Sequence, residues 1–364
     1  MNILLTVAYL DGWHGSAIQI LEYAEILSKT NQVSIACLRF TSDFKSLLQE
    51  TNVNVFEVKN ESMPLEYDLV YSFHFPVLSF LLNKGIKTKK WVAGSLSPTT
   101  ALESFPSYWK EANFLTVHSG RSIELHNMHY GIPQDKMKLF GNPIPDYFAD
   151  FKHHKDGFPK YPKKIGIVSN HTPDEILRIK KYLPKNIKLE FYGYSKKYVR
   201  ITPEILSQYD LIVTVGKTVN YALGMGIPVY EYDMFGGCGY ITVDNYAPEK
   251  FRNFCGLATE RKLDSQVIVS EILQNYEAAV CNISTLQSYA LDDFLLSKLM
   301  KDFIDFVNAS SEVNLSKEKL LDYSLEITHD IITTVLLAGI DTAKDKKIID
   351  RLIGFIRRRI YNWH

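Results

Sequence analysis

Apolar residues in the first half of the chain gather in short runs, separated by longer segments with helical spacing. The runs predict buried β-strands at residues 3–8, 32–38, 53–58, 69–73, 90–93 and 114–117. After the first strand and a polar loop at 10–15, we expect a helix that begins with Ser16 as its N-cap and ends at Ser28. Because strands that alternate with helices form mostly parallel sheets, residues 1–150 predict a doubly wound α/β domain.

The pattern of strands and helices stops near Pro143 and starts again at Lys164. The stretch between is rich in proline, charge and aromatic residues and has no sustained period, so we interpret 151–163 as a linker between two domains. The elements predicted beyond it are strands at 164–168 and 187–192 and helices at 174–183 and 203–209. They indicate a second doubly wound domain over 164–285. Such sheets bind ligands at the carboxyl ends of their strands, which predicts a cleft between the two domains.

Residues 210–240 contain the most informative pattern of the second domain. A β-branched run at 211–215 predicts a buried parallel strand, Gly216 ends it, and Thr218 is expected to cap the helix that follows. A helix N-terminus that follows a glycine presents unpaired N–H groups and the positive end of the helix dipole. This turn therefore predicts a binding site for an anion of the size of a diphosphate.

A second glycine-rich segment follows the same helix. The helix is expected to end before Pro228, and the next strand begins at Val229. The glycines that follow are Gly236, Gly237 and Gly239. They predict a flexible loop that faces the same end of the sheet as the first turn and lets the backbone approach a ligand closely. A plain turn is the alternative.

From Gln266 onward the apolar spacing is mostly helical, and we interpret 286–364 as a helical extension. One apolar side is expected to carry Leu291, Phe294, Leu295, Leu299, Phe303 and Phe306. Within 344–364 an apolar stripe is accompanied by seven basic and two acidic residues, which give a net charge of +5. This composition is typical of a helix that lies on an anionic membrane surface. A solvated helix docked on the protein core is the alternative.

Composition narrows the class of protein. A chain of 364 residues exceeds one ordinary core, and its 41 basic and 41 acidic residues create no global field that would attract nucleic acid. The four cysteines form no C-x-x-C pair, which predicts buried thiols in a reducing cytoplasm. No D-x-D pair or other metal-ligand spacing is present, so we expect no metal cofactor. The first ten residues have no basic leader, and no run approaches the roughly 20 apolar residues of a membrane span.

Several segments resemble glycosyltransferases with the GT-B fold, in which two Rossmann-like domains face each other. These segments are 10–27 (LDGWHGSAIQILEYAEIL), 118–148 (HSGRSIELHNMHYGIPQDKMKLFGNPIPDYF), 167–177 (IVSNHTPDEIL), 189–194 (LEFYGY) and 210–240. The resemblance covers about residues 1–280. It implies a nucleotide-sugar donor held mainly by the C-terminal domain and a glycan or lipid-linked acceptor on the N-terminal side. The implied role is surface polysaccharide or glycan biosynthesis at the cytoplasmic face of a membrane.

The chain departs from the family pattern at Tyr221, where many relatives carry a glutamate that binds the donor ribose. Ribose recognition is then expected from elsewhere, with Glu231 as one choice, or the donor is not the usual uridine diphosphate sugar. The departure supports an alternative function, a catalytically inactive GT-B scaffold that binds a nucleotide sugar or a partner transferase. A further alternative is a GT-B-fold nucleotide-sugar epimerase, which would require a cleft richer in carboxylates.

The residues that we expect to bind the donor lie on the second domain. They are Asn170, His171, Tyr194, Gly216, Lys217, Thr218, Tyr221, Glu231, Gly236 and Gly237. Gly216, Lys217 and Thr218 are predicted to hold the diphosphate, and a solvated loop position is the alternative for the lysine. Asn170 and His171 follow the first strand of this domain and either contact the donor or form a turn and helix cap.

The residues that we expect to carry the chemistry follow strands of the first domain. They are Asp11, His14, His74 and His118. An inverting transfer needs a general base for the acceptor hydroxyl, and Asp11 or His14 is our first choice, with His74 next. A retaining transfer needs no dedicated base. Each histidine by itself is more often structural than catalytic.

Overall fold

The computed structural model describes residues 1–49, 51–98, 100–151, 157–194, 196–259, 261–313 and 315. The predicted basic helix at 344–364 lies outside these residues, so its contact with a membrane stays a prediction.

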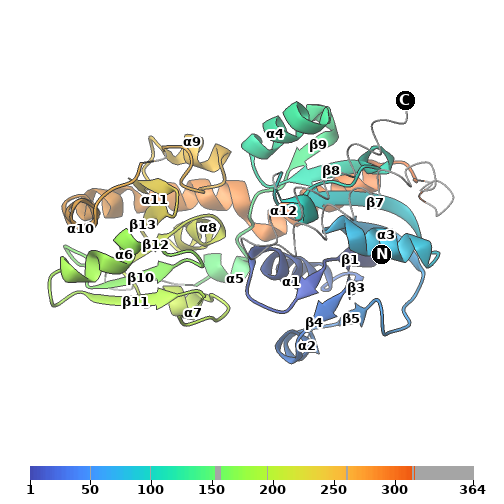
Figure 1. Ribbon diagram of the computed structural model, residues 1–364, viewed down its shortest axis with the longest axis horizontal. Coiled ribbons are helices and arrows are strands. Elements are labelled where there is room, and N and C mark those ends of the chain that lie inside the picture. The colour runs from blue at the N-terminus through green and yellow to red at the C-terminus, as the bar shows by residue number, and fades with distance from the viewer. Residues whose placement is uncertain are drawn as a thin grey trace, which may run out of the picture.

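The first 139 residues form a seven-stranded sheet in the order β5-β3-β1-β6-β7-β8-β9, and every neighbouring pair is parallel (Figure 1). Its strands are β1 (Asn2–Thr6), β3 (Gln32–Cys37), β5 (Val53–Glu57), β6 (Glu66–Ser72), β7 (Lys87–Ser95), β8 (Phe114–Val117) and β9 (Met137–Leu139). Ile3 and Leu5 belong to the core on one face of the sheet, and Leu4 belongs to the core on the other. Burial on both faces explains the continuous apolar runs and confirms the predicted parallel α/β sheet.

Four helices and a small strand pair accompany this sheet. They are α1 (Gly15–Leu27), α2 (Ser42–Gln49), α3 (Phe75–Asn83), α4 (Gly120–Tyr130) and the parallel pair β2 (Tyr9–Leu10) with β4 (Arg39–Phe40). The prediction that Ser16 caps α1 was wrong. His14 is the N-cap, because its Nδ1 accepts a hydrogen bond from the Ala17 N–H at 3.4 Å.

The second sheet has the order β11-β10-β12-β13-β14 and is parallel except at its last strand. Its strands are β10 (Lys164–Val168), β11 (Lys188–Tyr192), β12 (Leu211–Thr214), β13 (Val229–Asp233) and β14 (Gly236–Tyr240). The flexible loop predicted at Gly236 and Gly237 is instead strand β14, antiparallel to β13. A Cβ on Gly237 would lie 1.9 Å from the Glu231 carbonyl oxygen, so the glycines allow close strand pairing here.

The remaining helices surround the second sheet and return to the first. They are α5 (Asp146–Ala149), α6 (Asp174–Arg178), α7 (Pro203–Leu206), α8 (Lys217–Gly224), α9 (Tyr246–Phe251), α10 (Ser265–Gln274), α11 (Tyr276–Phe294) and α12 (Leu296–Ala309). The cap predicted at Thr218 was wrong, because α8 already begins at Lys217. Gly216 is its N-cap at φ 64°, a left-handed angle that glycine adopts without steric cost.

Within the described residues the chain crosses between the two sheets twice, and the two crossings are hydrogen-bonded to each other. The Ile144 N–H donates to the Phe294 carbonyl at 2.7 Å, and the Leu296 N–H donates to the Ile144 carbonyl at 2.8 Å. Leu295, between the two helices, has extended geometry at φ −59° and ψ 124°. The helical segment therefore breaks where it meets the first crossing.

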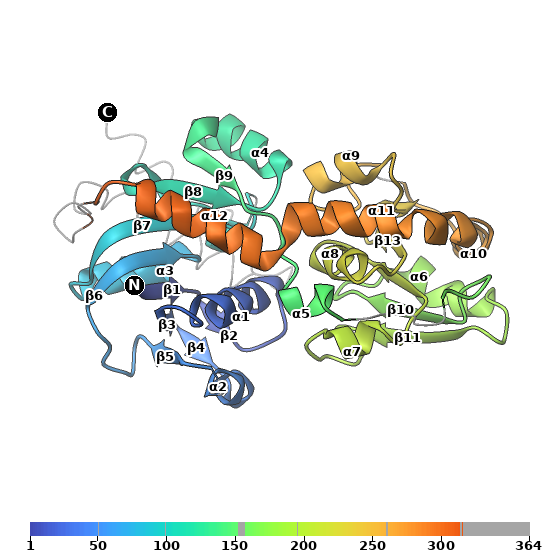
Figure 2. The ribbon, with the colours of Figure 1, turned by 180° about the vertical axis from the view of Figure 1, so that it is seen from behind.

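The break divides the apolar side that we predicted as one stripe. Phe294 of α11 belongs to the core of the second domain, whereas Phe303 of α12 is buried in the core of the first. Figure 2 shows α11 and α12 as two consecutive rods, one along each domain. The C-terminal helices are thus parts of both cores. Among the described helices, none has the length and apolarity needed to cross a bilayer.

We expect Phe303→Ala to lower the free energy of unfolding by about 3–5 kcal/mol, because it removes a buried ring from the first domain. The Phe303 ring lies 4.6 Å from Tyr71 and 5.6 Å from Phe140, between ring centroids. Phe306→Ala is the matched control on the same helix, since Phe306 is 41% exposed. Urea unfolding followed by circular dichroism measures both. Equal losses in the two variants would contradict a core role for α12.

Candidate active site

Two adjoining cavities lie between the domains at the carboxyl ends of both sheets. The first, which we call the aromatic cavity, has a volume of about 260 Å³ and is lined by Trp13, Gly15, Ile18, Val168, Ser169, Asn170, His171, Tyr192, Gly193, Tyr198, Val199, Ile201, Thr214, Val215, Lys217, Thr218, Tyr221 and Asp233. The second, the histidine cavity, has a volume of about 420 Å³ and is lined by Tyr9, His14, Gly15, Ser16, Gln19, His74, Leu96, Leu102, Glu103, His118, Asn142, Gly216, Lys217 and Asn253. Gly15 and Lys217 line both. The predicted interdomain cleft is present at the predicted strand ends.

The N-terminal turn of α8 lies between these cavities. Gly216 lines the histidine cavity and Thr218 lines the aromatic cavity. No side chain caps this helix, and its first turn contains no acidic residue. The turn therefore offers backbone N–H groups and the positive end of a helix dipole to both cavities.

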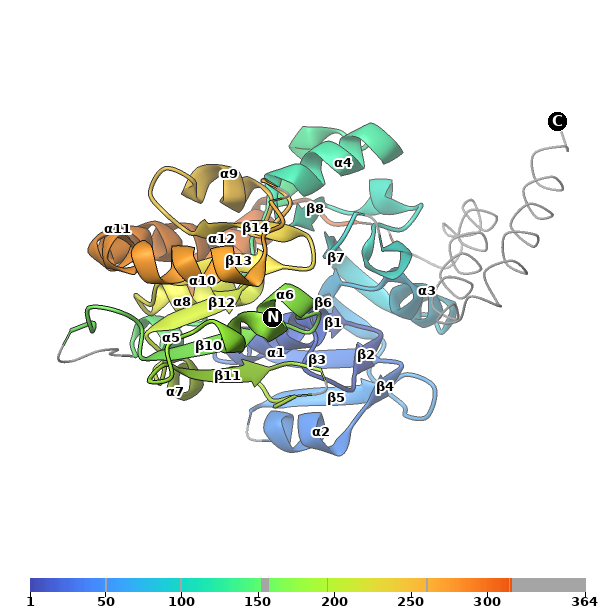
Figure 3. The ribbon, with the colours of Figure 1, turned by 60° about the vertical axis from the view of Figure 1, so that its left-hand side comes forward.

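Lys217, predicted to bind a diphosphate, makes a buried ion pair with the other domain. Its Nζ lies 2.7 Å from Glu22 Oε2 on α1, and the Tyr221 hydroxyl donates to the other oxygen of Glu22. Burial raises the pKa of Glu22 and lowers that of Lys217, and each partner opposes the shift of the other. The ion pair thus joins α1 of the first domain to α8 of the second (Figure 3).

A second ion pair joins the domains nearer to the surface. Arg200 donates to both carboxylate oxygens of Glu25, at 2.9 and 3.0 Å, and also to the Tyr147 hydroxyl at 2.9 Å. A bidentate pair of this kind fixes orientation as well as distance. Helix α1 therefore contacts the second domain through two successive carboxylates on one face.

His74 lines the histidine cavity in a strained conformation. It is buried, has φ 53°, and its Nδ1 accepts a hydrogen bond from the Ala8 N–H at 3.0 Å. The proton of the neutral ring is then on Nε2, which lies 3.9 Å from Glu103. The geometry makes His74 a hydrogen-bond donor toward the cavity rather than the base that we had considered.

Both ring nitrogens of His14 already have partners. Its Nδ1 caps α1 and lies 3.0 Å from Ser16 Oγ, and its Nε2 lies 3.5 Å from Asp11. Burial lowers the pKa of His14, and Asp11 opposes this shift. Asp11 itself binds Arg39 and lines neither cavity. The geometry thus gives our first-choice pair a role in shaping the loop, with neither ring nitrogen left to receive a proton.

His118 has the geometry that a base needs. Its Nδ1 lies 3.5 Å from the Ser95 carbonyl, which can only accept, so Nδ1 carries the proton and Nε2 keeps a lone pair. Burial lowers the pKa of His118 below its ordinary value, so the ring is neutral at pH 7. Sequence reasoning missed Glu103, which lines the same cavity from a short 3₁₀ turn after β7, because a three-residue turn has no periodic signal.

The donor-side candidates fall into two groups. Asn170, His171 and Tyr221 line the aromatic cavity, and Trp13 of the first domain faces them there. Tyr194 lies outside the lining and stacks on Tyr198, with ring centroids 4.8 Å apart. A Cβ at Gly12 would lie 2.7 Å from the Tyr198 hydroxyl, so this glycine lets the first loop approach the second domain.

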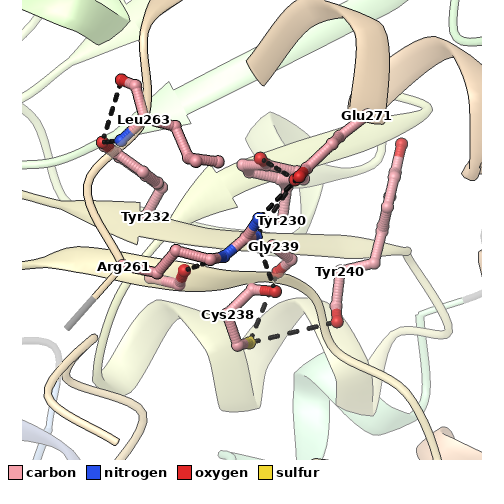
Figure 4. A network of polar contacts seen from close by, with 9 residues as sticks. Tyr230, Tyr232, Cys238, Gly239, Tyr240, Arg261, Leu263 and Glu271 are labelled. Carbon is pink, nitrogen blue, oxygen red and sulfur yellow. Dashed lines mark hydrogen bonds and ion pairs between the residues drawn. The ribbon is translucent and has the colours of Figure 1, made fainter. Parts of the chain in front are cut away.

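Glu231, Gly236 and Gly237 line neither cavity. Glu231 accepts a hydrogen bond from the Gly256 N–H at 2.6 Å, and burial raises the pKa of Glu231 to about 8. Arg261 binds the backbone of β14 and pairs with Glu271 of α10 (Figure 4). These contacts give β14 a structural role and leave Glu231 without access to a ribose in the aromatic cavity.

Glu231 also belongs to a group with Cys238 and Glu249 whose ligand atoms lie within 4.8 Å of one another. This group is likewise outside both cavities. Metal independence of the site stays a prediction.

We expect Glu22→Gln to lower the free energy of unfolding by about 3–5 kcal/mol, because it leaves Lys217 buried without an opposite charge. The double variant Glu22→Gln with Lys217→Met should recover most of this loss, since neither charge then remains. Glu25→Gln is the matched control one helical turn away, with an expected loss of about 1 kcal/mol or less. Chemical denaturation of the wild type, the two single variants Glu22→Gln and Lys217→Met, the double variant and the control measures the coupling. A double variant as unstable as the sum of its single variants would contradict the ion pair.

No family model and no curated protein matches this sequence. Solved structures do match it. Anabaena Alr3699/HepE in complex with UDP and glucose is 13% identical, with a TM-score of 0.57 over 84% of this chain and 99% of that chain. A glycosyltransferase from Rickettsia africae is 14% identical, with a TM-score of 0.51 over 84% and 97%. Arabidopsis thaliana UGT89C1 complexed with UDP-L-rhamnose is 11% identical, with a TM-score of 0.51 over 84% and 99%. At these identities the matches establish the architecture, and the chain has the GT-B fold of two facing Rossmann-like domains.

Proposed function

We propose that this protein is a glycosyltransferase that moves a sugar from a nucleotide-sugar donor to a glycan or lipid-linked acceptor, without a metal cofactor. The observation that carries the proposal is the uncapped N-terminus of α8 between two cavities, each of which both domains line. The nucleoside fits the aromatic cavity, the diphosphate lies at Gly216–Thr218, and the sugar extends into the histidine cavity. Alr3699/HepE with UDP and glucose and UGT89C1 with UDP-L-rhamnose support this donor class.

The leaving diphosphate needs stabilisation of its negative charge. The N–H groups and dipole of α8 supply part of it, and the Thr218 hydroxyl and Lys217 Nζ supply the rest. Because Glu22 already neutralises Lys217, the lysine is shared between the carboxylate and the diphosphate. This arrangement makes the backbone amides the main contact and the lysine an auxiliary one.

The acceptor hydroxyl must lose a proton as it attacks the anomeric carbon. In an inverting transfer, Nε2 of His118 receives that proton, since Nδ1 already carries one toward Ser95. His74 donates through Nε2 and orients Glu103 or a substrate oxygen. The roles of the three histidines are set by the backbone group at Nδ1, which donates to His74 and His14 and accepts from His118.

A catalytically inactive scaffold is the second candidate. The ion pair between Lys217 and Glu22 favours it, because a lysine already paired with a carboxylate stabilises a leaving diphosphate less. Saturation-transfer NMR with a panel of nucleotide sugars, followed by mass spectrometry of products formed with lipid and glycan acceptors, distinguishes the two. A glycosylated product supports the transferase, whereas binding with no product from any acceptor supports the scaffold.

We expect His118→Gln to retain nucleotide-sugar binding and to lower kcat by about 100-fold or more, because it removes the base. Since burial places the pKa of His118 below 6.5, the neutral form is lost as the pH falls through that lowered pKa. The acid limb of kcat/KM in the wild-type enzyme should therefore lie below pH 6.5 and disappear in the variant. His129→Gln, an exposed position on α4, is the control. An unchanged kcat in His118→Gln would exclude His118 as the base.

We place the reaction at the cytoplasmic face of a membrane, in surface polysaccharide or glycan biosynthesis. The basic composition of 344–364 supports this location. A hollow of about 600 Å³ on the first domain gives further support, since Lys110 and Lys138 line it together with Trp109 and Phe306. The hollow also includes Ser310, near the end of the described chain.

Deleting residues 344–364 should lower sedimentation with anionic liposomes, because it removes a net charge of +5 and an apolar stripe. The full chain and the truncated chain are compared on phosphatidylserine-rich and on neutral vesicles. Thermal unfolding of the truncated chain serves as the control for folding. Equal sedimentation of both chains would remove the membrane contact from this segment.

A further inference from the structure

A two-residue turn after α9 has a backbone conformation that most residues avoid. Asn253 has φ 62° and Phe254 has φ 51°. Asparagine tolerates this region moderately well, but a bulky aromatic residue is a genuine outlier there. Such strain costs about 1–3 kcal/mol for each residue and persists only where the surroundings enforce it. The backbone conformation of this turn therefore lowers the stability of the folded protein.

The turn is held by its contacts with the N-terminus of α8. The Gly216 N–H donates to the Phe254 carbonyl at 2.6 Å, and the Phe254 N–H donates to the Glu249 carbonyl at 2.8 Å. The Phe254 ring is buried, with its centroid 5.6 Å from that of Tyr246. The strained backbone thus connects α9 to the turn that faces both cavities.

Asn253 lines the histidine cavity together with Asn142. Asn253 Oδ1 accepts a hydrogen bond from Asn142 Nδ2 at 2.8 Å, and the Asn142 carbonyl accepts one from Asn220 Nδ2 at 2.7 Å. Three asparagines, from the turn, the first crossing and α8, therefore form a connected string. Asn253 Oδ1 accepts the bond from Asn142, so the Nδ2 of the same carboxamide is the group that remains to donate to a ligand.

The position of Asn253 relative to the diphosphate turn limits what it can contact. Gly216 and Lys217 line the same cavity, so a group attached to a diphosphate at this turn extends past Asn253. A sugar ring presents hydroxyl oxygens that accept hydrogen bonds, and a carboxamide held at one end is a rigid donor for them. In the proposed binding mode, the nucleobase occupies the aromatic cavity and does not reach Asn253.

We propose that Asn253 forms a subsite for the sugar of the nucleotide-sugar donor, with its Nδ2 donating to a sugar hydroxyl. Asn142 and Asn220 are positioning residues that fix the carboxamide. The left-handed backbone at Asn253 and Phe254 allows this placement, because the same turn brings the Phe254 carbonyl to the Gly216 N–H and Asn253 to the cavity lining. The inference rests on the proposed transferase function and specifies which group recognises the transferred sugar.

Asn253→Gly is the sharpest test, because glycine keeps the left-handed backbone and removes the carboxamide. Titration calorimetry compares UDP with UDP-glucose, UDP-galactose and UDP-N-acetylglucosamine, and GDP with GDP-mannose. In the wild type, the best nucleotide sugar should bind more tightly than its own diphosphate. In Asn253→Gly, affinity for the diphosphate should be unchanged, whereas affinity for the nucleotide sugar should fall about five- to tenfold. Asn60→Gly, in an exposed turn of the first domain, is the matched control.

Thermal unfolding distinguishes a loss of binding from a loss of folding. The midpoint temperature of Asn253→Gly should equal or exceed that of the wild type, because glycine adopts the left-handed backbone without strain. Asn142→Ala should reduce the sugar-dependent gain in affinity, and here too the diphosphate affinity should be unchanged. Equal ratios of nucleotide-sugar to diphosphate affinity in the wild type and Asn253→Gly would overturn the subsite and leave the transferase proposal standing. Failure of the wild-type protein to bind any nucleotide sugar in the panel would overturn both.

Discussion

The arrangement of the two domains depends on the backbone hydrogen bonds that join the two crossings at Ile144. The first crossing and the break between α11 and α12 pair through this one residue, in both directions. A Cβ at Gly141 would overlap the Phe294 ring, and one at Gly224 would lie 2.9 Å from Ile144. Small residues thus let three segments meet closely. The two domains keep their relative position because α11 packs in the core of the second domain, α12 packs in the core of the first, and both helices meet at Ile144.

Within that frame, electrostatics governs the centre of the cleft. Glu22 brings a negative charge from the first domain to Lys217 and Tyr221 of the second, where water is excluded. A buried pair costs desolvation that its attraction only partly returns, so it contributes more to the specific approach of the two domains than to net stability. It also sets the resting charge at the N-terminus of α8 near zero. An arriving anion therefore meets oriented N–H groups and a lysine that is already engaged.

The histidine cavity illustrates how hydrogen bonds distribute chemistry among identical side chains. An N–H donor occupies Nδ1 in His74 and His14, and a carbonyl faces Nδ1 in His118. The first two rings therefore present an N–H at Nε2, and the third presents a lone pair. Opposite them, the strained turn at Asn253 and the string to Asn220 place a carboxamide donor. The lining of the cavity thus includes acceptors, at His118 and the Glu103 carboxylate, beside the His74 donor.

The sequence by itself determined the alternation of strands and helices, the location of the cleft at the strand ends and the turn at Gly216, because each of these follows from local periodicity. It also indicated His14, His74 and His118 as candidates, because all three follow strands of the first domain. In the structure, all three line one cavity. Tertiary structure decided what periodicity does not encode. Glu22 and its ion-pair partner Lys217 are 195 positions apart in the sequence. Gly236 and Gly237 form a strand because they pair with β13. The helical segment breaks at Leu295, where it pairs with Ile144. Hydrogen-bond partners distant in sequence set the tautomers of His74 and His118 and hold the Asn253 side chain, and no local pattern specifies such partners.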